Sequence, residues 1–264
     1  MNKGFSPVIA VLVLAGIAVV AFFILKTPKP EADNLIKERE SAQVNWDYDP
    51  NNNAWQVKGT PPECPDPLVF PSPVEVNLVS GILYPGQIRG GDYKAHGGFR
   101  LDSLTGNEVG VYAPFDGNVT QAARHTQGDE VQYVLYFVND CGIMYKFDHL
   151  LELTDKFKKI LENVPLKGET DTRTTFINPP VFTSKGEQVA TKVGLSGNIF
   201  FDFGVYDLRQ KNGVDYSTRD YYNIGQYGEH AICWLDNLEP SDKSLVKSLP
   251  GADGESGKSS DYCR

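Results

Sequence analysis

The sequence predicts a mainly β domain that follows a single membrane-spanning helix. Near the amino terminus, a run of 21 residues carries no charge. The middle of the chain consists of short stretches rich in valine, tyrosine and phenylalanine, separated by Gly, Asp or Asn, which is typical of strands joined by turns. With 264 residues, of which 41% are hydrophobic, the chain is long enough for one sizeable domain with attachments.

Residues 1–26 are predicted to be a membrane anchor. The apolar run from Phe5 to Leu25 would form a helix of about 32 Å, which spans a bilayer. It ends in FFILKTPKP and not at a small-residue cleavage site, which favours an uncleaved anchor over a secretory signal. The opening NKGFSP is also similar to a pilin leader, in which cleavage would follow Gly4, but the glutamate usual in a bacterial pilin is absent. Lysines on both sides of the run leave the orientation open.

Three further segments follow. Residues 27–60 are polar and interrupted by proline and asparagine, which predicts a linker. Residues 61–240 form the predicted β-rich domain, in which only LLELTDKFKKILENV has the apolar spacing of an amphipathic helix. Residues 241–264 are a polar, glycine-rich tail, which would be loose unless Cys263 holds it down.

The four cysteines, Cys64, Cys141, Cys233 and Cys263, lie far apart and form no C-x-x-C pair, so structural zinc and a thioredoxin-like redox centre have no support. Two disulfides outside the cell are expected, with four buried thiols as the alternative. The sequence does not choose among the three possible pairings. The net charge of −9 and the lack of a basic, aromatic-rich stretch exclude nucleic-acid binding.

The four histidines are the main candidates for chemistry. No nucleophile elbow, phosphate-binding glycine loop or H-E-x-x-H motif is present. His125, beside a polar turn, and His230, in QYGEHAICW, are interpreted as solvated or core-edge side chains. His96 and His149 remain as candidate site residues.

The motifs around these two histidines occur in a particular order along the chain. HGGFRLDSLTGNEVGVYAPFDGNV is followed by YKFDHL and then by SKGEQVATKVGLSGNIFFDFGVYDLR. This order is similar to that of the lysostaphin/LytM-type zinc endopeptidases, which cut peptidoglycan cross-bridges. The resemblance covers residues 86–209 and implies a β-sandwich with the duplicated hybrid-motif architecture of that family.

The resemblance also implies a zinc site, most of whose residues are replaced here. In the family, a histidine, an aspartate four residues later and the last histidine of H-x-H hold zinc, while two further histidines assist the attacking water. His96 keeps the first ligand position and His149 keeps one assisting position. Arg100 stands in place of the aspartate, Phe200 in place of the other assisting histidine, and Asp202 in place of the final ligand.

Arg100 would weaken zinc binding strongly, because a guanidinium stays protonated and offers no lone pair. The two replaced ligands of the family contact one metal, so Arg100 and Asp202 are expected to be neighbours. The resemblance therefore predicts an Arg100–Asp202 salt bridge where the enzymes use zinc. Removing one partner of such a pair would cost about 3–5 kcal/mol.

A second interpretation keeps the metal. Alternate side chains of a strand share a face, so Asp102 could replace the carboxylate missing at Arg100. His96, Asp102 and Asp202 would then hold zinc, with His149 as acid and base. The charges of FDFGVYDLR allow two interpretations: Asp207 and Arg209 lie at the exposed end of a strand, or charged and aromatic residues form a groove for a peptide or glycan. The groove residues would be Arg100, Tyr112, His149, Asp202 and Tyr206.

Taken as a whole, the sequence predicts a single-pass protein of the cell membrane whose carboxy-terminal domain lies outside the cytoplasm. Its expected function is that of a pseudopeptidase without a cofactor, which binds cell-wall peptide or glycan or an envelope protein. One alternative is a divergent zinc hydrolase that cleaves peptide or cell-wall cross-links. Another is a pilin-like subunit of a surface filament.

Overall fold

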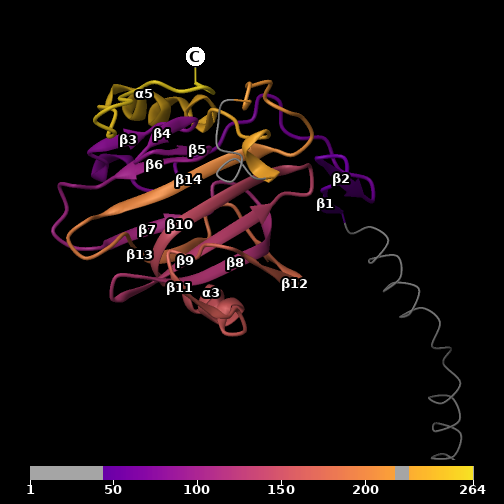
Figure 1. The fold of residues 1–264 in the computed structure, drawn as a ribbon, viewed down its shortest axis with the longest axis horizontal. Helices are drawn as coiled ribbons and strands as arrows, with labels where there is room; N and C mark the ends of the chain where they lie inside the picture. The colour runs from indigo at the N-terminus through magenta and orange to yellow at the C-terminus, as the bar shows by residue number, and fades with distance from the viewer. Residues whose placement is uncertain (1–43, 218–225, 264) are drawn as a thin grey trace, which may run out of the picture. The chain divides into compact units, whose positions relative to one another are not determined.

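The computed structural model describes residues 44–217 and 226–263, and this part of the chain is mainly β, as predicted (Figure 1). Its strands are β1 Asn45–Asp49, β2 Ala54–Lys58, β3 Gly81–Leu83, β4 Gln87–Arg89, β5 Asp92–Lys94, β6 Gly97–Arg100, β7 Glu108–Tyr112, β8 Gly117–Gln127, β9 Glu130–Val138, β10 Ile143–Leu153, β11 Leu166–Glu169, β12 Thr175–Thr183, β13 Gln188–Val193 and β14 Phe200–Asp207. Its helices are α3 Asp155–Leu161, α5 Pro240–Ser248 and the 3-10 turns η1 Val76–Leu78 and η2 Trp234–Asn237.

One ten-stranded sheet contains most of these strands. Its main path runs β11-β8-β9-β10-β14-β6-β3, β12 pairs with β8, and β13 connects β10 to β7. The central strands β10 and β14 are buried along almost their whole length. Polar side chains on these two strands must therefore find partners inside the protein.

The two faces of β14 have different roles, since successive side chains of a strand point to opposite sides. Phe201 and Phe203 point into an aromatic core, where Phe203 lies 5.2 Å from the ring of Trp234 and Phe99 lies 5.0 Å from the same ring. Asp202 therefore points to the opposite face, which carries the candidate site.

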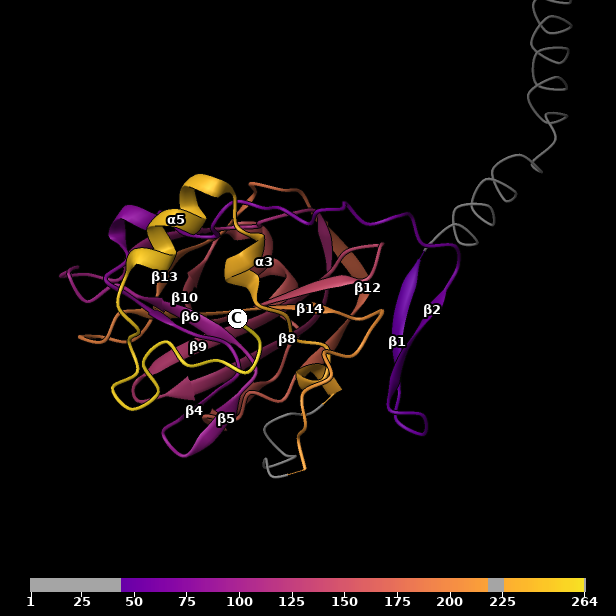
Figure 2. The same cartoon turned by 90° about the horizontal axis from the view of Figure 1, so that it is seen from above.

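The helical segments differ in part from the prediction. The expected amphipathic helix is α3, which buries Phe157 and Leu161, but Leu153 ends β10 and does not belong to the helix. The predicted tail contains α5 and continues along β3, where the amide of Ile82 donates to the carbonyl of Pro250 at 3.0 Å (Figures 1 and 2).

The structure pairs the cysteines as Cys64–Cys141 and Cys233–Cys263 and leaves no free cysteine among the described residues. The second bridge ties down the carboxy-terminal tail. Two disulfides fit an oxidising environment outside the cytoplasm.

The predicted linker is structured in its second half. The compact unit begins at Val44, and β1 and β2 form an antiparallel hairpin. Its indoles attach it to the domain: Trp46 Nε1 donates to the carbonyl of Asp140 at 3.1 Å, and the Trp55 ring stacks on Tyr227 at 5.5 Å. These contacts of two half-buried indoles hold the hairpin against the domain despite the polar composition of the segment.

The predicted membrane anchor, residues 1–26, lies outside the described residues. Among the helices that the structure does describe, none has the length and apolar character needed to cross a membrane.

Candidate functional site

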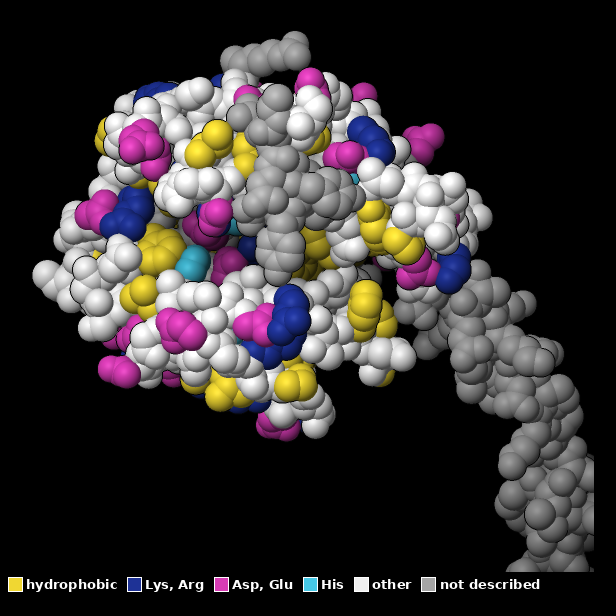
Figure 3. Space-filling model, in the orientation of Figure 1, with side chains coloured by type: hydrophobic (Ala, Val, Ile, Leu, Met, Phe, Trp, Pro, Cys, Tyr) yellow, Lys and Arg dark blue, Asp and Glu magenta, His cyan; other side chains and the backbone are white. Residues whose placement is uncertain are grey.

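A groove with a volume of about 1070 Å³ opens over β10 and β14, and Figure 3 shows histidine, acidic and hydrophobic side chains together in a hollow on this face. Most of the groove lining comes from strands that are far apart in the sequence and from the segment after β11. Its charged, histidine and aromatic residues are Arg89, Asp92, Lys94, His96, Arg100, His125, Tyr136, Lys146, Asp148, His149, Asp171, Arg173, Phe200, Asp202, Tyr206 and Tyr227.

Strand register brings the central acids of the groove together. Asp202 of β14 lies opposite Asp148 of β10 on one side and opposite Gly98 of β6 on the other. A Cβ atom added at Gly98 would lie 2.8 Å from Oδ1 of Asp202 and 2.6 Å from the carbonyl oxygen of Phe201. The second glycine of the HGG sequence is therefore required for β6 to approach Asp202 closely.

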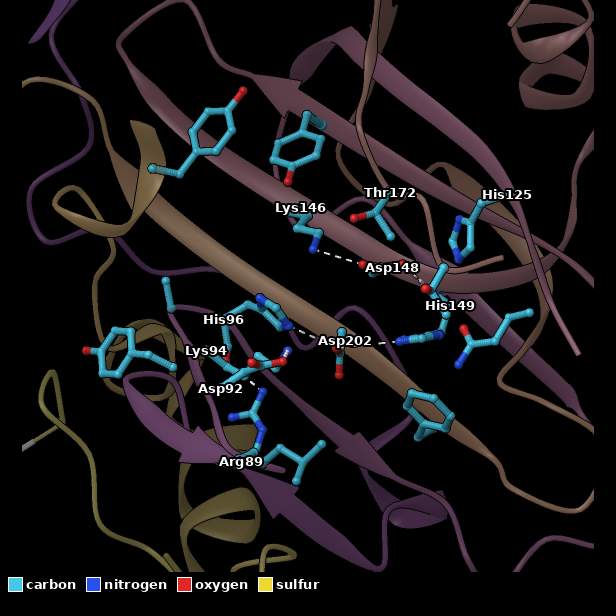
Figure 4. A pocket seen from close by; sticks show the side chains of 18 of the residues that line it. Arg89, Asp92, Lys94, His96, His125, Lys146, Asp148, His149, Thr172 and Asp202 are labelled. Carbon is cyan, nitrogen blue, oxygen red and sulfur yellow. Dashed lines mark hydrogen bonds and ion pairs between the residues drawn. The ribbon is translucent and has the colours of Figure 1, made fainter. Parts of the chain in front are cut away.

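Asp202 lies between two imidazoles, as the dashed lines in Figure 4 show. Its Oδ2 atom is 2.9 Å from Nε2 of His96 and 3.8 Å from Nε2 of His149. An ionised carboxylate only accepts hydrogen bonds, so the Nε2–H of His96 is the donor.

Burial and the nearby charges together determine the protonation states of His96 and Asp202. Burial lowers the pKa of His96 to about 4, with a further contribution from the positive charge of Lys146. Burial opposes the charged form of Asp202, but the two imidazoles and Arg89 together hold the pKa of this carboxyl below its usual value. At neutral pH the pair consists of a neutral imidazole and a carboxylate.

His149 is placed by an irregularity in β10. The strand pairs with β14 as far as Asp148 and with β13 from Leu150 on, and the register shifts between Phe147 and Leu150. At this bulge His149 has a φ of +61°, a left-handed conformation that is costly for a residue with a Cβ. Its ring reaches Asp202 and packs on Phe200 at a centroid distance of 4.2 Å. Such strain is concentrated at functional sites in proteins.

A buried ion pair lies next to Asp202. Nζ of Lys146 is 2.9 Å from Oδ2 of Asp148, and the two side chains are only 9% and 6% exposed. Burial disfavours both charges, but Asp148 keeps the pKa of Lys146 above its usual value, and Lys146 keeps the pKa of Asp148 below its own. The ammonium also lies 5.8 Å from the ring centroid of Tyr136.

The predicted Arg100–Asp202 salt bridge does not form. The Nε and Nη2 atoms of Arg100 both donate to Asp102, and the guanidinium lies 5.6 Å from the ring centroid of Phe200. The register explains the difference: Arg100 lies opposite Phe200, two residue pairs away from the Gly98–Asp202 position. Asp102, two residues further along the same chain, reaches the guanidinium first.

Two other predicted residues lie outside the groove lining. Asp102 accepts hydrogen bonds from Arg100 and from Oγ of Ser80 at 3.0 Å, and it does not line the groove. Tyr112 is on β7 and 43% exposed, opposite Gln188 of β13, and does not line the groove either. Tyr206, by contrast, is a buried wall residue of the groove.

His125 is a groove residue that the sequence interpretation missed. It is 1% exposed, lines the groove, and its Nδ1 atom is buried with no hydrogen-bond partner among the described residues. Burial lowers the pKa of His125, while the nearby carboxylate of Asp148 opposes the shift. The available signal was alternation, because His125 shares a face of β8 with Gln121 and Ala123. His230 is buried elsewhere and contacts the carbonyl of Gln210 at 2.8 Å.

The donor atoms do not fit the zinc that the resemblance implies. Of the expected ligands, Asp102 lies outside the groove lining and is bonded to Arg100 and Ser80, while His96 and Asp202 hydrogen-bond to each other. Within residues 44–217 and 226–263, no group of three or more His, Cys, Asp or Glu side chains is placed to hold a metal ion.

No protein-family model, curated protein or solved structure matches this chain.

Proposed function

We propose that this protein binds cell-wall peptide or glycan in the groove over β10 and β14 without cleaving it. One observation carries the proposal: His96 and Asp202, at two of the family's three ligand positions, hydrogen-bond to each other at 2.9 Å. The third position holds Arg100, whose guanidinium is ion-paired with Asp102. Each of these groups has a protein partner, which favours a stable binding surface over a metal-activated water.

The groove lining suits a ligand of mixed polarity. Tyr136 and Tyr227 stack at 5.0 Å and form a wall together with Tyr206, and Phe200 lies beside His149 on the other side of Asp202. Aromatic faces offer contact area to apolar groups and sugar rings, and the paired charges offer oriented donors and acceptors.

We also propose that the domain has the duplicated hybrid-motif architecture and is held outside the cytoplasm by residues 1–26. Both disulfides support this location, because they persist in oxidising compartments. A wall ligand or an envelope protein would be accessible to a domain in that position.

The test uses the full-length protein in detergent micelles. We expect zinc far below one atom per chain, co-sedimentation with purified cell wall and no release of muropeptides. Phe200→Ala should weaken wall binding about tenfold, the loss of one aromatic contact of about 1.4 kcal/mol. Tyr112→Ala is the matched control, because it removes a partly exposed aromatic ring outside the groove lining. Failure to bind wall or any envelope protein would overturn the proposal.

The competing function is a zinc hydrolase built from His96, Asp102 and Asp202 with His149 as acid and base. The left-handed backbone of His149 favours it, because strain of this kind accompanies catalytic groups. Near-stoichiometric zinc that is lost in His96→Ala, together with muropeptide release, would establish this function in place of binding. The filament hypothesis requires leader cleavage, so amino-terminal sequencing should then start at Phe5.

A further inference from the structure

The cations that line the groove are almost all paired with a carboxylate two residues away. Side chains at positions i and i+2 of an extended segment share a face, so such pairs form locally. The pairs are Lys94–Asp92, Arg100–Asp102, Lys146–Asp148 and Arg173–Asp171. Each of these cations therefore has a protein anion before any ligand arrives.

Arg89, at the end of β4, is the exception in the described part of the chain. Its Nη1 atom donates to the carbonyl of Tyr84 at 2.8 Å and its Nη2 atom to the carbonyl of His96 at 3.1 Å, and within the described residues it makes no ion pair. Asp92 lies opposite Arg89 in the β4–β5 hairpin, but its carboxylate is ion-paired with Lys94 at 3.0 Å. The guanidinium is thus oriented by two backbone dipoles and has no adjacent counter-charge within residues 44–217 and 226–263.

The surroundings make this arrangement costly without an anion. Burial lowers the pKa of Arg89, while the charges of Asp202 and Asp253 oppose the shift. Asp202 directs Oδ2 to His96 and has no ion pair with Arg89. A partly buried cation with no direct anion is destabilising, and a ligand anion would remove that cost.

We propose that Arg89 is the anion-binding residue of the groove and receives a carboxylate of the bound ligand. The ligand class is then a peptide with a free carboxyl end or a sugar acid, an assignment that rests on the proposed binding function. A guanidinium has five N–H donors, of which Arg89 gives two to the carbonyls of Tyr84 and His96. The remaining donors can bind a carboxylate by charge-assisted hydrogen bonds. Arg100 is less suited, because Asp102 already engages both its Nε and Nη2 atoms.

The experiment compares two probes that differ only in the carboxylate, triglycine and triglycinamide. Full-length protein in detergent micelles is titrated with each probe while the Nε–Hε NMR signal of Arg89 is followed. We expect triglycine to shift this signal and triglycinamide to bind about tenfold more weakly, which corresponds to one charge-assisted hydrogen bond.

Variants separate Arg89 from the other cations. Arg89→Gln should weaken triglycine binding about tenfold and leave triglycinamide binding unchanged, whereas Arg89→Lys should retain part of the preference. Arg173→Gln, which removes the guanidinium of an already paired cation in the same groove, should change neither. Equal affinity for the two probes, or no shift at Arg89 with millimolar triglycine, would overturn the assignment.

The two proposals fail in different ways. A carboxylate preference that depends on Arg89, without binding to wall, would refute the wall ligand but keep the anion site. Wall binding that survives in Arg89→Gln, with no carboxylate preference, would refute the anion site but keep the proposed function.

Discussion

Nε2 of His96 lies 2.9 Å from Oδ2 of Asp202 and donates a hydrogen bond to it. The contact connects the loop before β6 to the middle of β14, at the centre of the groove. It also means that the carboxylate at the centre of the site has a neutral imidazole as its direct partner and not a cation. The following experiments test this arrangement and the structural features around it.

His96 should titrate with an apparent pKa of about 4, which NMR of its ring protons can measure. Because the folded pKa lies below the unfolded value of about 6.5, the unfolded chain binds more protons between these values. Its contribution to stability is complete above pH 6.5 and decreases as the pH falls toward 4. His96→Asn should lose less stability than the wild type between pH 7 and pH 5. A ring that titrates near 6.5 would contradict the buried, neutral assignment.

Arg100 and Asp202 should behave as independent residues in a double-mutant cycle of urea unfolding. Arg100→Ala alone should cost about 1 kcal/mol or less, because its pair with Asp102 is partly exposed, at 25% and 54% of the two side chains. The effects of Arg100→Ala and Asp202→Asn should add within about 0.5 kcal/mol. A larger coupling energy would restore the salt bridge predicted from the sequence.

The Lys146–Asp148 pair should be sensitive to the loss of either partner. Asp148→Asn leaves a buried ammonium without its counter-charge, so the free energy of unfolding should fall by about 3–5 kcal/mol. The double variant Lys146→Met, Asp148→Leu should recover much of this loss, because it removes both charges. Lys58→Met is the control, since Lys58 and Asp47 form an ion pair of the same type with side chains that are 75% and 55% exposed. If Asp148→Asn were as mild as this control, the pair would not be buried in solution.

The left-handed backbone at His149 can be tested with two small substitutions. His149→Gly should be more stable than His149→Ala by about 1 kcal/mol, because glycine adopts positive φ without steric cost. At Lys192 of β13, whose φ is not positive, the order should be reversed. Thermal or urea unfolding of the four variants measures both differences. If the alanine variant were the more stable one at both sites, His149 would have an ordinary strand conformation.

The two disulfides should differ in their contribution to stability. The bridges span sequence separations of 77 and 30 residues, for which chain entropy predicts about 4.5 and about 3.7 kcal/mol. Replacing Cys64 and Cys141 by alanine should therefore lower the unfolding midpoint more than replacing Cys233 and Cys263. Removal of the second bridge should also release the tail, which limited proteolysis after Lys258 would detect. A protected tail without that bridge would show that packing along β3 is sufficient.

The sequence by itself determined the mainly β class. It also placed the helix at α3 and identified His96, His149 and Asp202, which the structure brings into contact around one carboxylate. These features depend on alternation, helical spacing and motif order, which are local properties of the chain. Disulfides were the expected use of the cysteines, but their pairing was open.

Only the tertiary structure decided which side chains contact each other in and around the groove. Arg100 binds Asp102 and not Asp202, since two residue pairs of the β6–β14 ladder separate two side chains that motif order places together. His125 and Arg89 line the groove because the fold brings β8 and the β4–β5 hairpin to its walls. The sequence did not predict the hairpin at residues 45–58, because the contacts that hold it are distant in the chain. The indoles of Trp46 and Trp55 donate to carbonyls 94 and 171 residues away. Ion pairs and hydrogen bonds form over a few ångströms, and sequence patterns specify strands and faces without fixing distances on that scale.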